Sequence, residues 1–196
     1  MALKARFLNT AFDSLPLDWT QKLPTIIPLA EIDPALVENL LDAAFGKDRM
    51  GRTAYKVREG MEMLEGLSVA AVDMAENELL GSLQCWPAAL TDEAGKMHPM
   101  IMVGPVAVHP DCQRQGIGQA MITAMIKELH QDESLPLVMI GDPAYYDRFF
   151  GFSPERTGGW KLPGPWDPER LLVRAPKDAV LPEKGKLGPW TKDKTV

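Results

Sequence analysis

The chain has 196 residues, of which 45% are hydrophobic and 24% are charged, and this composition predicts one soluble globular domain. The net charge of −6 argues against a nucleic-acid-binding protein, which normally has a basic surface. Two cysteines and three histidines are too few for a disulfide framework and unpromising for a metal site, so we expect no metal. No apolar stretch approaches the roughly 20 residues that span a bilayer, and the N-terminus lacks an export-signal pattern. We therefore expect a cytoplasmic protein without a membrane partner.

The first part of the chain predicts one short strand and two helices. The segment 25–29 (TIIPL) has the composition of a strand. Asp33 and Pro34 are a typical helix start, an N-cap followed by proline at the first helical position. Apolar residues follow at helical spacing until Gly46, where this helix is expected to end. A second helix is predicted over 53–63.

Three strand signals follow in the middle of the chain. The runs 67–74 and 78–86 are separated by a short polar connection, which predicts a hairpin, with Gly81 marking a bulge. The run 100–108 is apolar almost throughout, which is typical of a strand buried on both faces. Because proline cannot donate a hydrogen bond to a neighbouring strand, Pro105 predicts a local break in the pairing.

The remaining regular elements predict a sheet that is covered by helices. Residues 116–129 have the pattern of a strongly amphipathic helix, and 135–140 that of a buried strand. A short helix is expected over 143–150 and a last strand over 171–174. Strands that alternate with helices in this way predict an α/β fold, a mixed sheet with helices on its faces.

The segment 106–120 (VAVHPDCQRQGIGQA) carries the clearest chemical signal. A buried strand leads through a glycine-containing loop directly into the amphipathic helix. Main-chain N–H groups at a helix N-terminus bind phosphate, and Gly116 and Gly118 have no side chains to block its approach, while Arg114 adds a positive charge. The dinucleotide fingerprint lacks its third glycine, and the P-loop signature is absent. A tight turn without a ligand is the alternative explanation.

Residues 113–118 (QRQGIG) match the Q/R-x-x-G-x-G/A signature of the GNAT superfamily of acyl-CoA-dependent N-acyltransferases, which this chain resembles. The preceding residues 106–110 (VAVHP) are similar to the superfamily's fourth strand and turn. Gly151 and Phe152 resemble the Gly-Phe pair that follows its fourth helix. The stretch GDPAYYDRFFGFS is most similar to small bacterial predicted N-acetyltransferases.

The resemblance implies a fold and a cosubstrate. The fold would be a mixed, mostly antiparallel central sheet flanked by helices, with a splay between the fourth and fifth strands. The cosubstrate would be acetyl-CoA, its pyrophosphate held by main-chain N–H groups of the glycine loop and its pantetheine arm paired with the preceding strand, which would polarise the thioester carbonyl. Pro105 fits this implication, because it interrupts pairing where the two strands must part. The residues so assigned to the cofactor are Val106, Ala107, Val108, Gln113, Arg114, Gln115, Gly116, Ile117 and Gly118.

The resemblance also implies a tyrosine that protonates the departing thiolate. A phenol, with a pKa of about 10, can donate to a thiolate whose conjugate acid has a pKa of about 8.5. In the superfamily this tyrosine usually lies four residues before the glycine of Gly-Phe, a position that is Asp147 here. The doubled Phe149-Phe150 accounts for a shift by one residue, so we assign Tyr146 as the catalytic acid and Tyr145 as the second choice. The alternative is that both rings only pack.

No general base for the incoming amine is identified from the sequence. Four acidic residues lie in regions that form the acceptor pocket in such folds, although a solvated surface carboxylate is the more common explanation for each. His109 is interpreted as structural, and nothing near Cys112 marks it as a reactive thiolate. The four acidic residues are Glu59, Glu62, Asp92 and Glu93.

Together the patterns and the resemblance favour an enzyme that transfers an acetyl or short acyl group from acetyl-CoA to a primary amine by direct attack on the thioester. The acceptor, a small molecule or a peptide, stays open, and we expect a monomer or a homodimer. The alternative is an acyl-CoA-binding sensor or regulatory module without acceptor turnover, which the displaced tyrosine keeps under consideration. A nucleotide-dependent oxidoreductase is disfavoured by the missing third glycine.

The chain divides into three predicted segments. Residues 1–24 form an N-terminal arm, 25–156 the acetyltransferase core, and 157–196 a C-terminal segment rich in proline, glycine and tryptophan. Prolines and glycines favour ordered turns, and the tryptophans argue against a disordered tail, so we expect the last segment to pack on the same domain. We expect its loop 158–166 to form a wall of the acceptor site.

Overall fold

The computed structural model describes residues 24–129, 135–176 and 178–191, so nearly all of the predicted arm at 1–24 lies outside the described residues. The strands are β1 (Thr25–Pro28), β2 (Val69–Asp73), β3 (Glu78–Thr91), β4 (Met97–Val108), β5 (Leu137–Ile140), β6 (Gly159–Lys161), β7 (Leu171–Arg174) and β8 (Lys184–Pro189). The α-helices are α1 (Pro34–Phe45), α2 (Thr53–Val57), α3 (Ile117–Leu129) and α4 (Pro143–Phe150). The 3-10 turns are η1 (Leu29–Glu31), η2 (Arg49–Gly51), η3 (Glu65–Leu67), η4 (Pro110–Cys112) and η5 (Pro168–Arg170).

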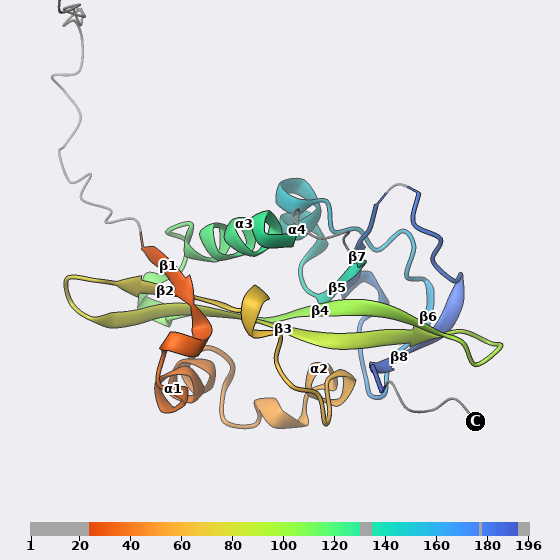
Figure 1. Ribbon diagram of the computed structural model, residues 1–196, viewed down its shortest axis with the longest axis horizontal. Helices are drawn as coiled ribbons and strands as arrows, with labels where there is room; N and C mark the ends of the chain where they lie inside the picture. Colours follow the sequence, from red (N-terminus) through yellow and green to blue (C-terminus); the bar gives the residue numbers. More distant parts are fainter. Residues whose placement is uncertain (1–23, 130–134, 177, 192–196) are drawn as a thin grey trace, which may run out of the picture.

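The strands form one mixed, mostly antiparallel sheet with helices on both faces. Six strands lie in the order β1-β2-β3-β4-β5-β7, while β8 pairs with β3 and β6 pairs with β8. The pairs β4–β5 and β6–β8 are parallel, and the other described pairs are antiparallel. Helices α3 and α4 cover one face of the sheet, and α1 and α2 cover the other (Figure 1). The predicted α/β fold class is therefore confirmed.

The fourth and fifth strands, β4 and β5, part after two paired positions. β5 then leads into α4, while β4 continues to Val108 with one edge that β5 does not cover. On its other edge, β4 pairs with β3 through a register shift at Gly104 and Pro105. The predicted splay and the predicted break in pairing at Pro105 are thus both present. The two β4–β5 pairs are Ile101–Leu137 and Met102–Val138.

Local capping signals set the helix starts that the sequence predicts. The side chain of Asp33 accepts a main-chain N–H at the start of α1, and Asp142 caps α4 in the same way. The prediction of a helix over 53–63 was wrong in its length, because α2 ends at Val57. Gly60 has a φ of +71°, which is incompatible with a continued right-handed helix.

The C-terminal part of the chain contains two strands that the sequence patterns did not predict. β8 pairs with the end of β3, which reaches Thr91 and is longer than expected. β6 pairs with β8, and its Trp160 is buried together with Leu187 of β8. The sequence of β8, KGKLGP, is rich in residues that are depleted in strands, so this strand depends on its partners more than on local propensity.

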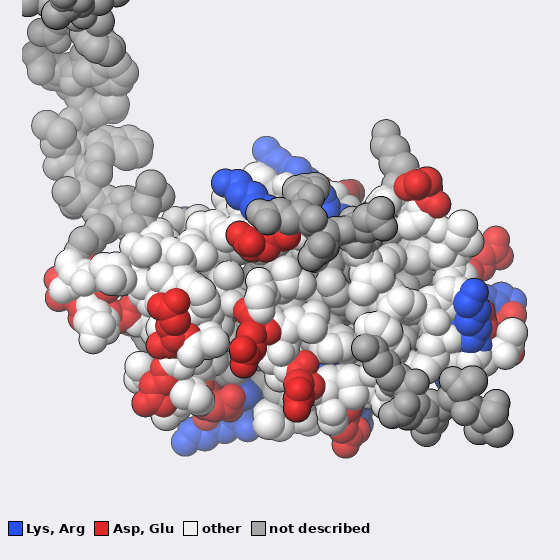
Figure 2. All heavy atoms as spheres, in the orientation of Figure 1, with Lys and Arg blue, Asp and Glu red and all other residues white. Residues whose placement is uncertain are grey.

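The surface reflects the negative net charge of the chain. On the face drawn in Figure 2, acidic side chains are scattered over the described surface. This distribution is typical of solvated carboxylates. In the part of the chain that the structure describes, no helix has the length and the apolar character needed to cross a membrane.

Helix α3 packs closely on the sheet at Gly81. A Cβ added at this glycine would lie 2.8 Å from Met121 Cε, 3.0 Å from the carbonyl oxygen of Ala107 and 3.1 Å from Ile117 Cγ2. The register shift between β2 and β3 lies beside this residue, as the predicted bulge requires. Gly81 therefore lets the first turn of α3, and the glycine loop before it, lie against the sheet.

The substitution Gly81→Ala should destabilise the protein by about 1–3 kcal/mol, because the added methyl group overpacks a site that includes a fixed carbonyl oxygen. The measurement is the free energy of unfolding from urea denaturation. The control is Gly66→Ala, where an added Cβ would have no neighbour within 4 Å. That variant should stay within about 0.5 kcal/mol of the wild type. Equal stability of the two variants would contradict the close packing of α3.

Candidate active site

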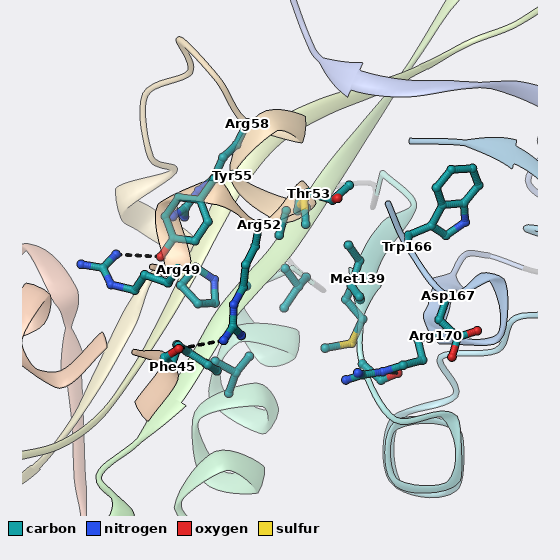
Figure 3. Close-up of a pocket in the computed structure, with 18 of the residues that line it drawn as sticks. Phe45, Arg49, Arg52, Thr53, Tyr55, Arg58, Met139, Trp166, Asp167 and Arg170 are labelled. Carbon is teal, nitrogen blue, oxygen red and sulfur yellow. Dashed lines mark hydrogen bonds between the residues drawn. The ribbon is translucent and has the colours of Figure 1, made fainter. Parts of the chain in front are cut away.

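Two adjoining cavities open where β4 and β5 part. The larger has a volume of about 960 Å³ and is lined by residues of η2, α2, β4, β5, α4 and η5 (Figure 3). The smaller has a volume of about 630 Å³ and is lined by residues of β4, the glycine loop, α3 and α4. Because four residues line both cavities, one ligand can extend from the first into the second. These residues are Phe45, Val106, Tyr145 and Tyr146.

The smaller cavity lies at the N-terminus of α3. The loop before the helix turns sharply, with positive φ angles of 64° at Arg114 and 79° at Gly116. The first hydrogen bond of the helix runs from the N–H of Ala120 to the carbonyl of Gly116, at 2.9 Å. The N–H groups that precede it have no carbonyl partner within the helix, and with the helix dipole they suit a phosphate group. A Cβ added at Gly118 would meet only Val108, at 3.8 Å, and the Tyr145 hydroxyl, at 3.9 Å.

Seven of the nine residues assigned to the cofactor line this smaller cavity. The other two are Ala107, whose side chain is buried in the core cluster against α1, and Gln115, which is exposed. The glycine loop and the end of β4, which follow one another in the chain, thus lie around one space. The seven lining residues are Val106, Val108, Gln113, Arg114, Gly116, Ile117 and Gly118.

Tyr146 and Tyr145 stand between the two cavities. The Tyr146 ring packs against the end of β5, where a Cβ added at Gly141 would lie only 2.5 Å from it. Burial raises the pKa of Tyr146 to about 12. Burial also raises the pKa of Tyr145, against the opposing effect of its hydrogen bond with Gln119 of α3. The two rings meet edge to face, with centroids 4.9 Å apart, and both phenols stay protonated at neutral pH.

Arg49 lines the larger cavity, and neighbouring carboxylates neutralise its charge. It is only 4% exposed and forms ion pairs with Glu38 and Asp42 of α1. It also donates a hydrogen bond to the Tyr55 hydroxyl at 2.7 Å (Figure 3). Although burial lowers the pKa of Arg49, the hydrogen bonds to these three groups raise it above its ordinary value. Arg49 therefore joins α1 to α2 and is balanced by its own carboxylates.

Arg58 lines the same side of the larger cavity and is bound differently. It is 8% exposed, and its guanidinium carbon lies 4.2 Å from the ring centroid of Tyr55 and 4.1 Å from that of Trp86. It donates a hydrogen bond to the side-chain oxygen of Gln84 at 2.8 Å. Burial lowers the pKa of Arg58 to about 10. None of the ion pairs among the described residues gives it a carboxylate partner.

The opposite side of the larger cavity comes from the end of β5, the start of α4 and η5 (Figure 3). Asp142 and Asp167 line it, and each caps the helical turn that follows it. Arg170 donates a hydrogen bond of 3.3 Å to the main-chain carbonyl at the end of β5. Trp166 also lines the cavity and belongs to the loop predicted over 158–166, whose first part forms β6.

The four acidic residues considered as general bases line neither cavity. Glu59 and Glu62 are exposed, and Glu93 lies in the turn between β3 and β4. Asp92 in the same turn binds His98 at 2.8 Å, and this hydrogen bond, together with main-chain N–H groups of the turn, lowers its pKa. The carboxylates that do line the larger cavity are Asp48, Asp142 and Asp167.

His109 and Cys112 lie in the connection between β4 and α3. His109 Nδ1 accepts the main-chain N–H of Asp111 at 3.4 Å and caps η4, in line with the structural role predicted for it. Burial raises the pKa of the half-buried Cys112 thiol. A thiol with a raised pKa is a poor nucleophile at neutral pH, so this cysteine does not have the features of a catalytic one.

The sequence patterns did not indicate that Arg58 and its neighbours form one side of the larger cavity. Its partner Gln84 lies 26 positions away in the chain, in the middle of β3. The signal that could have marked this side is the presence of three arginines, at 49, 52 and 58, in one short segment before the sheet. All three line the larger cavity.

A mixed sheet that parts between two parallel strands, beside a helix N-terminus, is the arrangement expected of a GNAT acetyltransferase. Residues 25–154 match the family model described as acetyltransferase (GNAT) domain. The match covers more than half of the chain, so the protein belongs to the GNAT acetyltransferase family.

Known proteins agree with this assignment. A GNAT family N-acetyltransferase (YhbS) of Escherichia coli, solved in complex with CoA, is 22% identical, with a TM-score of 0.68 over 86% of this chain and 90% of that one. A GNAT family acetyltransferase of Brucella melitensis, solved with acetyl-CoA, is 21% identical, with a TM-score of 0.57 over 84% and 94% of the two chains. The tRNA(Met) cytidine acetyltransferase TmcA of Vibrio cholerae is 31% identical over 108 residues. These residues are 53% of this chain but only 13% of that protein.

The raised pKa of Tyr146 predicts a pH-dependent contribution to stability. The unfolded chain releases this proton at a pKa of about 10, before the folded protein does, so the contribution is complete below pH 10 and is lost as the pH rises towards 12. Between about pH 9.5 and 11.5 the wild type should lose about 2 kcal/mol of unfolding free energy more than Tyr146→Phe does. Urea denaturation at several pH values measures this difference.

The control for this prediction is Tyr145→Phe, which keeps the more buried phenol and should keep most of the pH dependence of the wild type. Parallel stability curves for the wild type and Tyr146→Phe would show that the burial of Tyr146 does not perturb its ionisation.

Proposed function

We propose that this protein transfers an acetyl group from acetyl-CoA to a primary amine. The observation that carries the proposal is the position of Tyr145 and Tyr146 between the cavity at the N-terminus of α3 and the larger cavity beside it. A cosubstrate in the first cavity and an acceptor in the second would meet at the uncovered edge of β4, close to the two phenols.

The smaller cavity has the chemistry that coenzyme A requires. N–H groups of the loop 113–117 and of Gly118 would bind the pyrophosphate, and the flexible Arg114 would add positive charge. No atom lies within 3.4 Å of a Cβ added at Gly118, and this space suits a bulky phosphate group. Val106, Ala107 and Val108 would lie along the pantetheine arm. Bound in this way, acetyl-CoA supplies an acyl group that is activated as a thioester.

The contribution of the protein to the reaction would be mainly positioning and main-chain polarity. N–H groups on the uncovered edge of β4 would polarise the thioester carbonyl while the amine attacks it. Tyr146 would donate its proton to the departing sulfur. Burial raises its pKa to about 12, which keeps the phenol protonated at neutral pH but makes it a weaker acid than a free tyrosine. Tyr145, whose hydroxyl lies near Gly118, is the second candidate for the acid.

We also propose that residues 25–156 form the catalytic core and that the C-terminal segment from 157 belongs to the same domain. The family match over 25–154 supports the first part of this division. The pairing of β8 with β3, and the burial of Trp160 against the sheet, support the second. Trp166 of the loop 158–166 lines the larger cavity, which supports the proposal that this loop forms a wall of the acceptor site.

A second candidate function is an acyl-CoA-binding sensor without acceptor turnover. One observation favours it: the position four residues before Gly151, where the family commonly has a tyrosine, is Asp147. Release of free thiol from acetyl-CoA that depends on an added amine supports the enzyme. Tight binding of acetyl-CoA without such release, across amines of every class, supports the sensor.

The substitution Gly118→Leu should weaken coenzyme A binding about tenfold or more, because the new side chain would enter the smaller cavity. The fold should be preserved, since leucine is a better helix former than glycine and nothing lies within 3.4 Å of the new Cβ. Isothermal titration calorimetry with coenzyme A measures the effect. The control Gly158→Leu is also open around its Cβ, lies outside both cavities, and should bind as the wild type does. Equal affinities of the two variants would remove the smaller cavity from the cofactor site.

An acetyl-CoA turnover screen across amine classes, with the wild type and two tyrosine variants, tests the catalytic proposal. Tyr146→Phe should lower kcat by about 10²-fold or more, because it removes the acid while leaving both cavities in place. Tyr145→Phe should change kcat much less, since this residue is only the second choice for the acid. If both variants turn over as the wild type does, neither tyrosine is the general acid.

A further inference from the structure

The buried arginine of the larger cavity has no use in the chemistry described so far. Arg58 is 8% exposed, lines the acceptor cavity and has no carboxylate partner among the described residues. Burial lowers the pKa of Arg58 and the charge of Glu38 opposes this effect, although the two side chains form no ion pair. A buried charge without a contacting counter-charge is unfavourable, so an anion bound at this position would be stabilised. Arg49, the other buried arginine of this cavity, differs from Arg58 because Glu38 and Asp42 balance its charge.

Two aromatic rings and an amide surround the guanidinium of Arg58. Its central carbon lies 4.2 Å from the ring centroid of Tyr55 and 4.1 Å from that of Trp86, within the range of cation–π interactions. Gln84 uses one of its N–H donors. Tyr55 is a second side-chain hydrogen-bond partner of Arg58. Because an arginine has five N–H donors and Arg58 lines the larger cavity, donors remain for a ligand, and the planar guanidinium suits a bidentate anion such as a carboxylate.

The hydrogen-bond partner of Arg58 lies near the proposed place of reaction. Gln84 lies between Leu83 and Cys85, at the register shift where β3 faces Gly104 and Pro105 of β4. The Arg58–Gln84 pair therefore adjoins the break in β4 from which the uncovered edge continues. A small acceptor held at Arg58 would have its other end near the place where β4 and β5 part.

The other charged groups of the larger cavity leave this assignment intact. On the side of Arg58, Arg49 is balanced and Arg52 binds the carbonyl of Phe45 at 2.7 Å. Asp167 lies on the opposite side (Figure 3). Asp142 also lines the cavity, and both carboxylates suit a positively charged amine better than a carboxylate. The charged residues lining this cavity are Asp48, Arg49, Arg52, Arg58, Asp142, Asp167 and Arg170.

We propose that the acceptor is a small amine that also carries a carboxylate, an amino-acid-like zwitterion, and that Arg58 binds this carboxylate. The inference rests on the proposed N-acetyltransferase function and narrows its substrate class. Arg58 acts in it as a specificity-determining residue, and it takes no part in proton transfer.

The test compares each carboxylate acceptor with its own amide. The probes are L-α-amino acids and ω-amino acids of three to six carbons, each paired with the corresponding carboxamide. The wild type should acetylate at least one acid with a kcat/KM about tenfold or more above that of its amide. In Arg58→Gln this ratio should fall towards one through a higher KM for the acid, with the amide unchanged. Arg58→Lys keeps the charge without the planar fork and should retain part of the preference.

A matched control is Arg156→Gln, which removes an exposed arginine that donates a hydrogen bond to the carbonyl of Ala179 and lines neither cavity. This variant should keep the acid-to-amide ratio of the wild type. Calorimetric binding of the N-acetylated acid and of its amide gives a second readout that does not need turnover, and the wild type should bind the acid more tightly.

The results separate the two proposals. If amines are acetylated but no acid is preferred over its amide, or if Arg58→Gln lowers both equally, the substrate class is wrong while the acetyltransferase stands. If no amine is acetylated, the acetyltransferase function fails. The calorimetric comparison then tests by itself whether Arg58 binds a carboxylate. If Arg58→Gln does not fold, the ratio in the wild type and in Arg58→Lys decides. Lack of an acid preference in the wild type overturns the proposal.

Discussion

The parting of β4 and β5 after two residue pairs is the constraint on which the rest of the structure depends. A sheet edge without a neighbouring strand offers its main-chain groups to a ligand, and β4 keeps such an edge as far as Val108. Because β5 ends so early, α4 begins beside the gap and brings Tyr146 to it. Gly141 permits this approach, since any side chain there would collide with the Tyr146 ring. One interruption of pairing thus produces both the edge that can bind a ligand and the position of the phenol.

The same interruption organises the opposite side of the cavity. Where β4 shifts its register, β3 turns Gln84 towards α2, and Gln84 binds Arg58. Two buried arginines then stand close together with different kinds of compensation. Arg49 is balanced by carboxylates of α1 and serves as a structural link, whereas Arg58 is held by an amide and by aromatic rings and forms no ion pair among the described residues. This difference, more than the number of arginines, decides which of them can bind an anionic ligand.

The sequence predicts those parts of the molecule that depend on neighbouring residues in the chain. Asp33 and Asp142 mark helix starts because a cap acts within three residues, and the glycine loop is recognisable because its residues are contiguous. The larger cavity is different, because it brings together residues from α2, β4, β5 and η5. The pair Arg58–Gln84 exists only through the register of β3, and β8 exists only because β3 continues beyond β2. No local propensity encodes either one.

The C-terminal segment contacts a residue of the larger cavity through a hydrogen bond that the local sequence does not predict. The Thr53 hydroxyl at the start of α2 donates a hydrogen bond to the carbonyl of Pro165, and a Cβ at Gly164 would lie 2.7 Å from the same hydroxyl oxygen. The helix that leads to Arg58 is therefore joined to the loop that carries Trp166. Neither Thr53 nor Trp166 lines the smaller cavity at α3. The contact between Thr53 and Pro165 therefore belongs to the larger cavity, while the glycine loop before α3 lines the smaller one.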